Sequence, residues 1–421
     1  MSASPERVAD AVAAAYTAEW TRVLSTVVRA ARNFDVAEDC VQDAYAQALL
    51  TWERDGIPDS PGAWLTTVAV RKAIQLHRRD ATLAKKLPDL VQEQYQPPTD
   101  PGAGTVFEAV PDDRLRLIFT CCHPALSAEA RIALTLRLVC GLTSAEVAKA
   151  FLVKEATMQA RITRAKKKIA DAGIAYRTPT SAELPERLAS VLDTVLLVYN
   201  AGHIAPAGAA LMRTDLADRA LQIARMLRAL LPDDIETAAL LALLLLTDAR
   251  RTARVDDAGD LVQLERQDRS RWDREEIEEG LDLLRHAASA GSTSRYVVMA
   301  SLAAVHDEAP NWEATDWPRM VALYDLLLDR WPSPVVALNR AIAIGMADGP
   351  EVGLSELAPL MAEPALATYP YLAAARADFL RRLGRNTEAV AAYGEALLLT
   401  ANSVEATYLR RRLEEVQPGH G

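Results

Sequence analysis

The clearest pattern of apolar and polar positions lies in residues 143–169, which predict two short helices joined by a tight turn. Thr143 and Glu146 have the spacing of a capping box, in which a hydroxyl and a carboxylate accept hydrogen bonds from free backbone amides at a helix start. The apolar stripe of the first helix is Val147, Ala148 and Phe151. The stripe of the second is Met158, Ile162, Ala165 and Ile169, so both helices are amphipathic.

The second helix of this pair is strongly basic. Its polar and cationic residues lie on or beside the solvent side, away from the apolar stripe: Gln159, Arg161, Arg164, Lys166, Lys167 and Lys168. An amphipathic pair with a basic second helix is typical of a helix-turn-helix motif, which places that helix in the major groove of DNA. The alternative is a helical hairpin with a solvated basic face.

Residues 10–50 predict two further helices. The apolar positions of the second share one face: Val36, Cys40, Val41, Ala44, Tyr45 and Ala48. A mostly acidic strip lies between them, largely on another face: Glu38, Asp39, Gln42 and Asp43. Such a strip suits docking onto a basic helical partner. An ordinary solvated helix face with charges near its N-terminus is the alternative.

Residues 53–65 predict a loop because they contain two glycines and two prolines. The helix that follows carries a basic set: Arg71, Lys72, His77, Arg78 and Arg79. A basic helix beside Trp64 suits the binding of phosphates and the stacking of an unpaired base. Trp64 is equally suited to be an anchor in the hydrophobic core.

Residues 81–111 lose the helical periodicity and are rich in proline and glycine, which predicts a linker. The next helical module begins at residue 112 and contains Cys121, Cys122, His123 and Cys140. Adjacent cysteines do not supply the usual spacing of zinc ligands. Buried structural thiols are therefore favoured over a metal site.

From residue 184 onward the chain predicts helical hairpins. The clearest repeat signature is a Leu383-Gly384-Arg385 turn followed by small and aromatic positions: Ala389, Tyr393, Ala396 and Leu397. This spacing is typical of a tetratricopeptide unit. Stacked units of this kind form a curved array that binds peptides or protein surfaces. A compact helical bundle without a groove is the alternative.

The charge of the 421-residue chain is unevenly distributed. Its formal net charge is −10, yet residues 1–180 hold 23 Lys/Arg against 21 Asp/Glu, and residues 181–421 hold 24 against 36. A near-neutral half with local basic clusters, joined to an acidic half, indicates a nucleic-acid module joined to a protein-interaction module.

Several functional classes receive no support from the sequence. It shows neither a secretory signal nor an apolar run of bilayer length, and its four cysteines give no disulfide framework. We therefore expect a cytoplasmic protein that does not enter a membrane. No common motif of hydrolases, zinc proteases or nucleotide-binding loops occurs, and the six histidines are scattered. We expect no enzyme activity, no cofactor and no metal.

The first 180 residues resemble a group IV (extracytoplasmic-function type) sigma factor of bacterial RNA polymerase. The helix that docks on the polymerase clamp in that family resembles DVAEDCVQDAY. The segment that melts the promoter and reads the minus-ten element resembles PGAWLTTVAVRKAIQLHRR. The helix-turn-helix that reads the minus-thirty-five element resembles residues 142–169. IFTCCHPAL, DRSRWDREEIEEG and LGRNTEAVAAYGEALLL resemble the subgroup with a long tetratricopeptide-like C-terminal extension. The three sigma motifs occur in the order found in that family.

The resemblance implies an all-α fold with two helical sigma domains, the second containing the helix-turn-helix, followed by a tetratricopeptide-like domain of helical hairpins. Its parts are sigma domain two in residues 1–80, the linker in residues 81–111, sigma domain four in residues 112–177 and the extension in residues 178–421. The implied partners are the clamp and flap regions of core RNA polymerase and promoter DNA. The extension is expected to contact the sigma domains of the same chain or the polymerase.

The resemblance also implies roles for individual residues. The contacts with the clamp are assigned to Glu38, Asp39, Gln42 and Asp43. Capture of a flipped minus-ten base is assigned to Arg54, Asp55, Gly56, Ile57 and Pro58, and binding of the opened strand to Trp64, Arg71, Lys72, Arg78 and Arg79. Reading and clamping of the minus-thirty-five duplex are assigned to Lys154, Thr157, Gln159, Arg161 and Arg164, with phosphate contacts from Lys166, Lys167 and Lys168.

The function predicted in this way is promoter-specific initiation of transcription, with the extension modulating activity either by inhibiting it or by being required for it. A second hypothesis is a one-component DNA-binding regulator with a helical-repeat sensor domain. It explains the helix-turn-helix and the extension but gives no role to the acidic helix or to the Trp64 segment. A third is a scaffold that binds protein alone.

Overall fold

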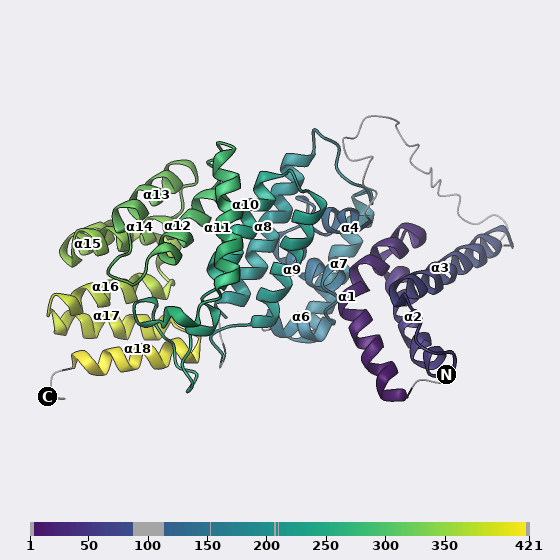
Figure 1. The fold of residues 1–421 in the computed structure, drawn as a ribbon, viewed down its shortest axis with the longest axis horizontal. Coiled ribbons are helices and arrows are strands. Elements are labelled where there is room, and N and C mark those ends of the chain that lie inside the picture. The colour runs from purple at the N-terminus through teal and green to yellow at the C-terminus, as the bar shows by residue number, and fades with distance from the viewer. Residues whose placement is uncertain (1–3, 87–112, 152, 206–207, 209, 418–421) are drawn as a thin grey trace. The chain divides into compact units, whose positions relative to one another are not determined.

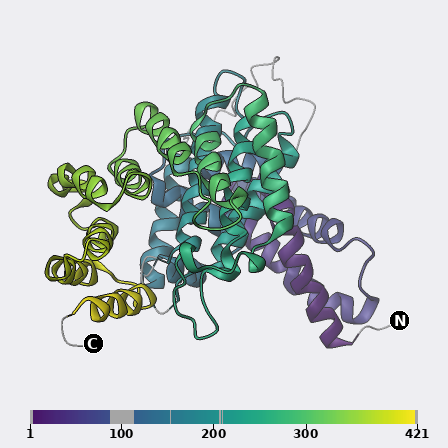
Figure 2. The ribbon, with the colours of Figure 1, turned by 60° about the vertical axis from the view of Figure 1, so that its left-hand side comes forward.

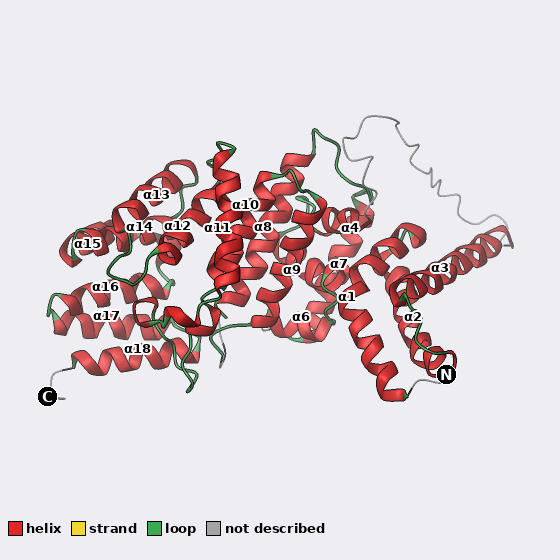
Figure 3. Ribbon diagram, in the orientation of Figure 1, coloured by secondary structure: helices red, strands yellow, loops and turns green. Residues whose placement is uncertain are grey.

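The chain is described by a computed structural model, which covers residues 4–86, 113–151, 153–205, 208 and 210–417 and, in residues 77–86, the backbone alone. The described residues are helical, with no β-strand among them (Figures 1 and 3). This confirms the predicted all-α fold. The chain divides into two compact units, Met1–Thr194 and Val195–Gly421. Most of the predicted linker, residues 87–111, lies outside the described residues.

The first unit begins with three long helices, α1 (Pro5–Ala31), α2 (Phe34–Asp55) and α3 (Pro61–Lys86), which pack pairwise against one another. The α1–α2 corner is tight because Arg32 adopts a left-handed conformation at the end of α1 and the Asn33 side chain caps α2. The buried side of α1 includes Trp20, Val23 and Leu24. The apolar stripe predicted for α2 lines the same core, with Cys40, Val41, Ala44, Tyr45 and Ala48 all buried.

The rest of this unit consists of shorter helices. These are α4 (Asp113–Cys121), α5 (Ala128–Leu134), the π-helical turn η1 (Thr135–Val139), α6 (Ser144–Ala150) and α7 (Glu155–Asp171). Thr143 and Glu146 form the predicted capping box at the start of α6. The predicted stripe of α7 is confirmed in full, since its buried residues are Met158, Ile162, Ala165 and Ile169.

Helix α8 (Leu184–His203) passes from the first unit into the second. The second unit continues with α9 (Thr214–Leu230), α10 (Ile235–Asp248), the short 3-10 turns η2 (Arg251–Ala253), η3 (Leu264–Arg266) and η4 (Arg269–Arg271), α11 (Arg274–Ser289) and α12 (Arg295–Glu308). It then contains α13 (Trp317–Arg330), α14 (Pro334–Ala347), α15 (Pro350–Leu357), the turns η5 (Ala358–Ala362) and η6 (Pro364–Leu366), α16 (Pro370–Arg382), α17 (Asn386–Leu399) and α18 (Ser403–Val416).

The repeat signature of the second unit corresponds to the hairpin α16–α17, which packs with α18 at the C-terminal end (yellow in Figures 1 and 2). Gly384 makes the turn between the two helices with φ of 71°. The small and aromatic positions Ala389, Tyr393 and Ala396 are buried against residues of α16 and α18. The helical-hairpin extension predicted from the sequence is therefore present.

The charged segment of residues 268–274, around Trp272, is held by contacts within the second unit. The Arg269 guanidinium donates to the carbonyl oxygens of His306 and Ala309, at 2.5 and 2.8 Å, and lies 4.3 Å from the centre of the Trp272 ring. These carbonyls are at the end of α12, where helical backbone lacks its own donors. Arg269 thus ties the segment to α12.

No helix in the described ranges has both the length and the apolarity needed to cross a bilayer.

Two glycines allow three helices of the second unit to converge. A Cβ added at Gly345 in α14 would lie 2.3 Å from the Phe379 ring, and one at Gly353 in α15 would lie 2.5 Å from it. Phe379 of α16 is 2% exposed and fills the space that these glycines leave. Glycine is required here by the close approach of the ring.

We predict that Gly353→Ala destabilises the second unit by about 1–3 kcal/mol, because its methyl group would overlap the Phe379 ring. Gly394→Ala in α17 is the matched control, since no atom lies within 4 Å of its added Cβ, and it should stabilise by up to about 1 kcal/mol through helix propensity. Thermal or urea unfolding of the two variants measures the difference. Equal stability of Gly353→Ala and the wild-type protein would contradict the packing described.

Candidate nucleic-acid interface

Helix α7 presents a row of polar and cationic side chains to solvent. The exposed residues of this row lie at the helix start and between the buried positions: Lys154, which is the N-cap, Thr157, Gln159, Arg164, Lys167 and Lys168. Because the stripe faces α5 and α6, the opposite face is available along the length of the helix. This is the geometry in which a recognition helix enters the major groove.

Arg161 is held more firmly than its neighbours on α7. Its guanidinium lies 3.4 Å from the Glu129 carboxylate of α5 and 5.5 Å from the centre of the Phe151 ring. The side chain is half-buried, so its orientation is fixed by the helix-turn-helix itself.

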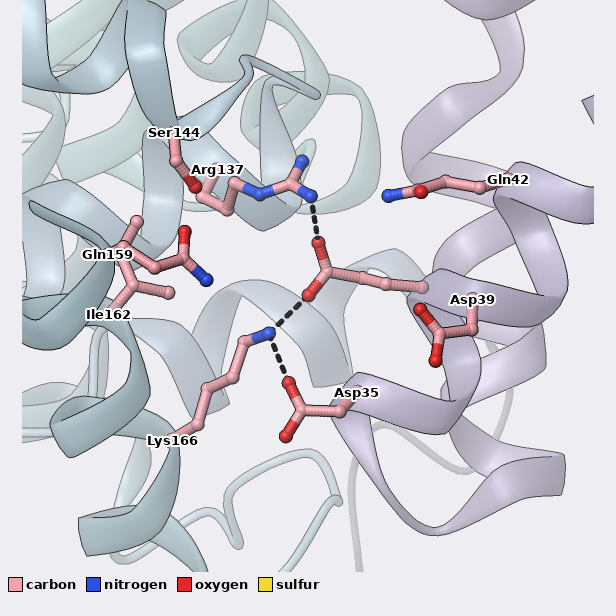
Figure 4. Close-up of a pocket in the computed structure, with 9 residues that line it drawn as sticks. Asp35, Asp39, Gln42, Arg137, Ser144, Gln159, Ile162 and Lys166 are labelled. Atoms are coloured by element: carbon pink, nitrogen blue, oxygen red, sulfur yellow. Dashed lines mark hydrogen bonds and ion pairs between the residues drawn. The ribbon is translucent and has the colours of Figure 1, made fainter. Parts of the chain in front are cut away.

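Lys166 points in another direction, toward α2. Its ammonium group donates to the Asp35 carboxylate at 2.7 Å and to the Glu38 carboxylate, and its side chain is 12% exposed (Figure 4). Lys166 is therefore enclosed by ion pairs, whereas Lys167 and Lys168 are solvent-exposed.

The acidic strip of α2 likewise contains one buried residue and three exposed ones. Glu38 is 4% exposed and forms a second ion pair, at 2.6 Å, with the Arg137 guanidinium of η1. Asp39, Gln42 and Asp43 are exposed. Asp43 accepts a hydrogen bond from Lys72 of α3, which links a residue of the polymerase-binding set to one of the DNA-binding set.

A small cleft between α2 and α7 brings several of these residues together. Its volume is about 210 Å³, and Asp39 and Gln42 line it from α2, facing Gln159 and Ile162 of α7 (Figure 4). Residues assigned to polymerase binding and residues assigned to DNA binding thus share one cleft.

The loop predicted for residues 53–65 is shorter in the structure, because α2 continues to Asp55 and α3 begins at Pro61. Arg54 and Asp55 pair with each other at 2.7 and 2.8 Å and are exposed, while Gly56, Ile57 and Pro58 are half-buried. This pairing lowers the pKa of Asp55 through hydrogen bonds from Arg54. The loop backbone turns at Gly56, whose φ is 91°.

Trp64 is half-buried and packs edge-to-face on Trp52, with 5.5 Å between ring centroids. Trp52, which is 1% exposed, supplies the core anchor, and part of Trp64 stays accessible at the start of α3. Arg71 is exposed on the same helix. The side chains of Arg78 and Arg79 lie outside the described residues.

A junction between α1 and η1 was not found by sequence reasoning. Three side chains of α1 donate to carbonyl oxygens near the end of η1: Trp20 to Leu138 at 3.0 Å, Thr21 to Val139 at 2.6 Å and Tyr16 to Gly141 at 2.7 Å. The sequence contained a weak signal, since all three donors fall within two turns of one amphipathic helix. Nothing in that pattern indicated which partner they meet.

The segment that joins α7 to α8 is also fixed within the first unit. The Tyr176 hydroxyl donates to the Ser25 carbonyl of α1 at 2.8 Å and approaches the Asp113 carbonyl at 3.3 Å. Burial raises the pKa of Tyr176. Farther along, hydrogen bonds from Arg177 and from the Thr180 backbone lower the pKa of Glu183, which keeps this carboxylate charged.

Helix α8 begins by packing on α4. Arg187 donates to the Phe119 carbonyl, and the Ser190 hydroxyl donates to the Cys122 carbonyl, both at 2.6 Å. The first turns of the extension therefore complete the end of α4 by satisfying carbonyls that the helix leaves free. Cys121 and Cys122 are buried here, and burial raises the pKa of both thiols. Within the described parts of the chain, no three potential ligands gather into a metal site.

Comparison with family models matches three regions of the chain. Sigma-70 region 2 matches residues 15–82, which cover most of α1, all of α2 and most of α3. Sigma-70 region 4 matches residues 116–169, which cover the helix-turn-helix. A family of unknown function, DUF6596, matches residues 187–288 at the start of the extension.

Two similar proteins cover different lengths of the chain. Uncharacterized protein R00370 of Rhizobium meliloti (strain 1021) is 39% identical over 396 residues, which are 94% of this chain and 93% of that protein. ECF RNA polymerase sigma factor SigK of Mycobacterium sp. (strain KMS) is 32% identical over 161 residues, which are 37% of this chain and 80% of that protein. With both sigma regions matched in order on the helices described above, the chain belongs to the ECF family of RNA polymerase sigma factors.

Proposed function

We propose that this protein is the promoter-specificity subunit of a bacterial RNA polymerase, reading a minus-ten and a minus-thirty-five element. The observation that carries the proposal is the ordered pair of sigma regions, the second on a helix-turn-helix with an exposed cationic face. Core polymerase performs the chemistry, so the protein acts as an initiation factor and not as an enzyme.

The polymerase contact is assigned to the acidic face of α2, with Glu38, Asp39, Gln42 and Asp43. A basic surface on the clamp would complement this face, which contributes chiefly to orientation and association rate. The exposure of Asp39, Gln42 and Asp43 supports the assignment directly. Glu38 would become available after its ion pairs with Arg137 and Lys166 are exchanged for clamp residues.

The minus-ten contact is assigned to the α2–α3 loop and to the start of α3. Residues 54–58, at the end of α2 and the start of the loop, would receive a flipped base, and the accessible part of Trp64 would stack on the opened strand. Arg71 and Lys72 would bind its phosphates, together with Arg78 and Arg79.

The minus-thirty-five contact is assigned to α7. Lys154, Thr157, Gln159, Arg161 and Arg164 would meet base edges and phosphates of the duplex, and Lys166, Lys167 and Lys168 would meet phosphates. Alanines at positions 156 and 160 leave few long side chains at the start of the helix, so the base preference does not follow from these residues.

The extension is proposed to modulate the activity of the sigma domains. The hydrogen bonds from Arg187 and Ser190 of α8 to carbonyls at the end of α4 support direct coupling between the extension and the helix-turn-helix module. The match to the Rhizobium meliloti protein over 94% of this chain indicates that the two parts occur together in that relative as well.

We predict that purified chain plus core polymerase initiates transcription from its own two-element promoter without another sigma factor. Run-off transcription on linear templates measures this, with core polymerase alone as the background. A one-component regulator would bind the template and leave the background unchanged, which would contradict the proposal.

We predict that Arg164→Ala and Lys168→Ala each weaken promoter binding and reduce the slope of log affinity against log salt by about one, because each removes one phosphate contact. Arg22→Ala is the matched control, since this exposed cation lies on α1 and is not among the residues assigned to DNA binding. Binding of holoenzyme to promoter DNA at several salt concentrations gives the slopes. An unchanged slope for both α7 variants would show that α7 does not contact the promoter phosphates.

We predict that a chain ending at Thr194 retains the fold of the first unit and changes the level of promoter-directed transcription. A chain ending at Arg177 should in addition unfold at lower temperature, because Arg187 and Ser190 no longer satisfy the α4 carbonyls. Thermal unfolding and run-off transcription of both chains separate stability from regulation. If the chain ending at Thr194 gives the same transcript level as the full chain, the extension has no modulating role.

A further inference from the structure

An acidic residue of α5 faces a cation of the recognition helix α7. Glu129 lies in the first turn of α5, and its Oε2 atom is 3.4 Å from Nη2 of Arg161. The Phe151 ring, at the C-terminal end of α6, supports the same guanidinium, with 5.5 Å between its centre and Cζ of Arg161. Two residues from two neighbouring helices therefore hold this group in one place.

Arg161 lies at the edge of α7 and not at the centre of its exposed face. It follows the buried Met158 by three residues and precedes the buried Ala165 by four, so it lies beside the apolar stripe, and its side chain is 24% exposed. Small exposed residues form the centre of the opposite face: Ala156, Ala160 and Thr163. When a helix enters the major groove, side chains at its edge meet the phosphates that border the groove, whereas base edges lie under the centre of the face.

Neighbouring cations of α7 lack this support from other helices. Arg164 is exposed and donates from Nε to the Ala160 carbonyl of its own helix at 3.2 Å. Lys167 and Lys168 are exposed as well. A long side chain that is ordered before it binds loses less rotamer freedom on binding. Arg161 is thus the cation of this group that is best prepared for a DNA contact.

The ion pair leaves most of the guanidinium available. Arginine carries five N–H donors in a planar fork, and the shortest contact with Glu129 involves Nη2, at a separation longer than an ordinary hydrogen bond. A phosphate can accept from the remaining N–H groups while Glu129 stays in place. The Glu129 side chain is 69% exposed, so water and salt screen its repulsion of that phosphate.

On the basis of the proposed contact between α7 and the minus-thirty-five duplex, we propose that Glu129 is a positioning residue for DNA binding. Together with Phe151 it holds the Arg161 guanidinium at the edge of the major groove, where Arg161 binds one phosphate. Glu129 has the same sign of charge as DNA, so a role through its electric field alone would weaken binding. The two roles therefore predict opposite effects when the charge is removed.

Two substitutions separate these roles in holoenzyme bound to a duplex of the promoter that transcript mapping identifies. Glu129→Gln removes the charge, whereas Glu129→Asp keeps it and shortens the side chain by one methylene group. We expect each to raise the Kd about threefold, the size typical of an exposed ion pair, at an unchanged salt slope. A lower Kd for Glu129→Gln, or an unchanged Kd for Glu129→Asp, would overturn the proposal. Thermal unfolding is the control for folding, and Asp suits the first turn of α5 as Glu does.

A double-mutant cycle tests whether Glu129 acts through Arg161. Arg161→Ala should weaken binding and lower the salt slope by about one, because it removes one phosphate contact. In a chain that already carries Arg161→Ala, Glu129→Asp should cause no further loss. An equal loss in both backgrounds would mean that Glu129 acts on α5 or on the DNA by itself, and the proposal would fail.

Neutral methylphosphonate linkages, placed one at a time in the minus-thirty-five element, locate the contact. At one position the neutral linkage should remove the effects of both Arg161→Ala and Glu129→Asp. If no position does so, Arg161 does not bind a phosphate and the proposal is wrong. The proposed function is tested separately: holoenzyme that binds no promoter refutes that function, whereas binding that Arg164→Ala weakens and Arg161→Ala leaves unchanged refutes the positioning role alone.

Discussion

Burial of one carboxylate, Glu38, constrains the arrangement of the whole first unit. A buried charge is tolerated when opposite charges and hydrogen bonds compensate its lost hydration. Here the compensation comes from Arg137 and Lys166, which belong to the helix-turn-helix module and lie about a hundred residues farther along the chain. The positions of α2 and α7 are therefore coupled through Glu38, together with Asp35, which also binds Lys166.

The ion pairs of Glu38 are not the only link between the first three helices and the helix-turn-helix module. Neutral hydrogen bonds from Tyr16, Trp20 and Thr21 to carbonyls near the end of η1 join the same two parts. The extension adds a further contact, since α8 completes the end of α4 beside the buried cysteines.

The local structure was predictable because it depends on periodicity and capping chemistry. The capping box of Thr143 and Glu146, the buried stripe of α7 and the Ala389-Tyr393-Ala396 hairpin follow from spacing within one or two helices. The contacts between distant helices were not predictable in this way. Tyr16, Trp20 and Thr21 look like ordinary residues of an amphipathic helix, and their acceptors are backbone carbonyls, which carry no sequence signal. Likewise, no local feature distinguishes Lys166 from Lys167 or Lys168.

Mapping the 5′ ends of transcripts after overexpression of the full-length chain tests whether one chain reads a two-part promoter for RNA polymerase. We expect induced transcripts that share two upstream motifs, near minus-ten and minus-thirty-five, at constant spacing. Induced transcripts that share a single operator-like site in front of promoters of another sigma factor, or that share no upstream motif, would contradict it.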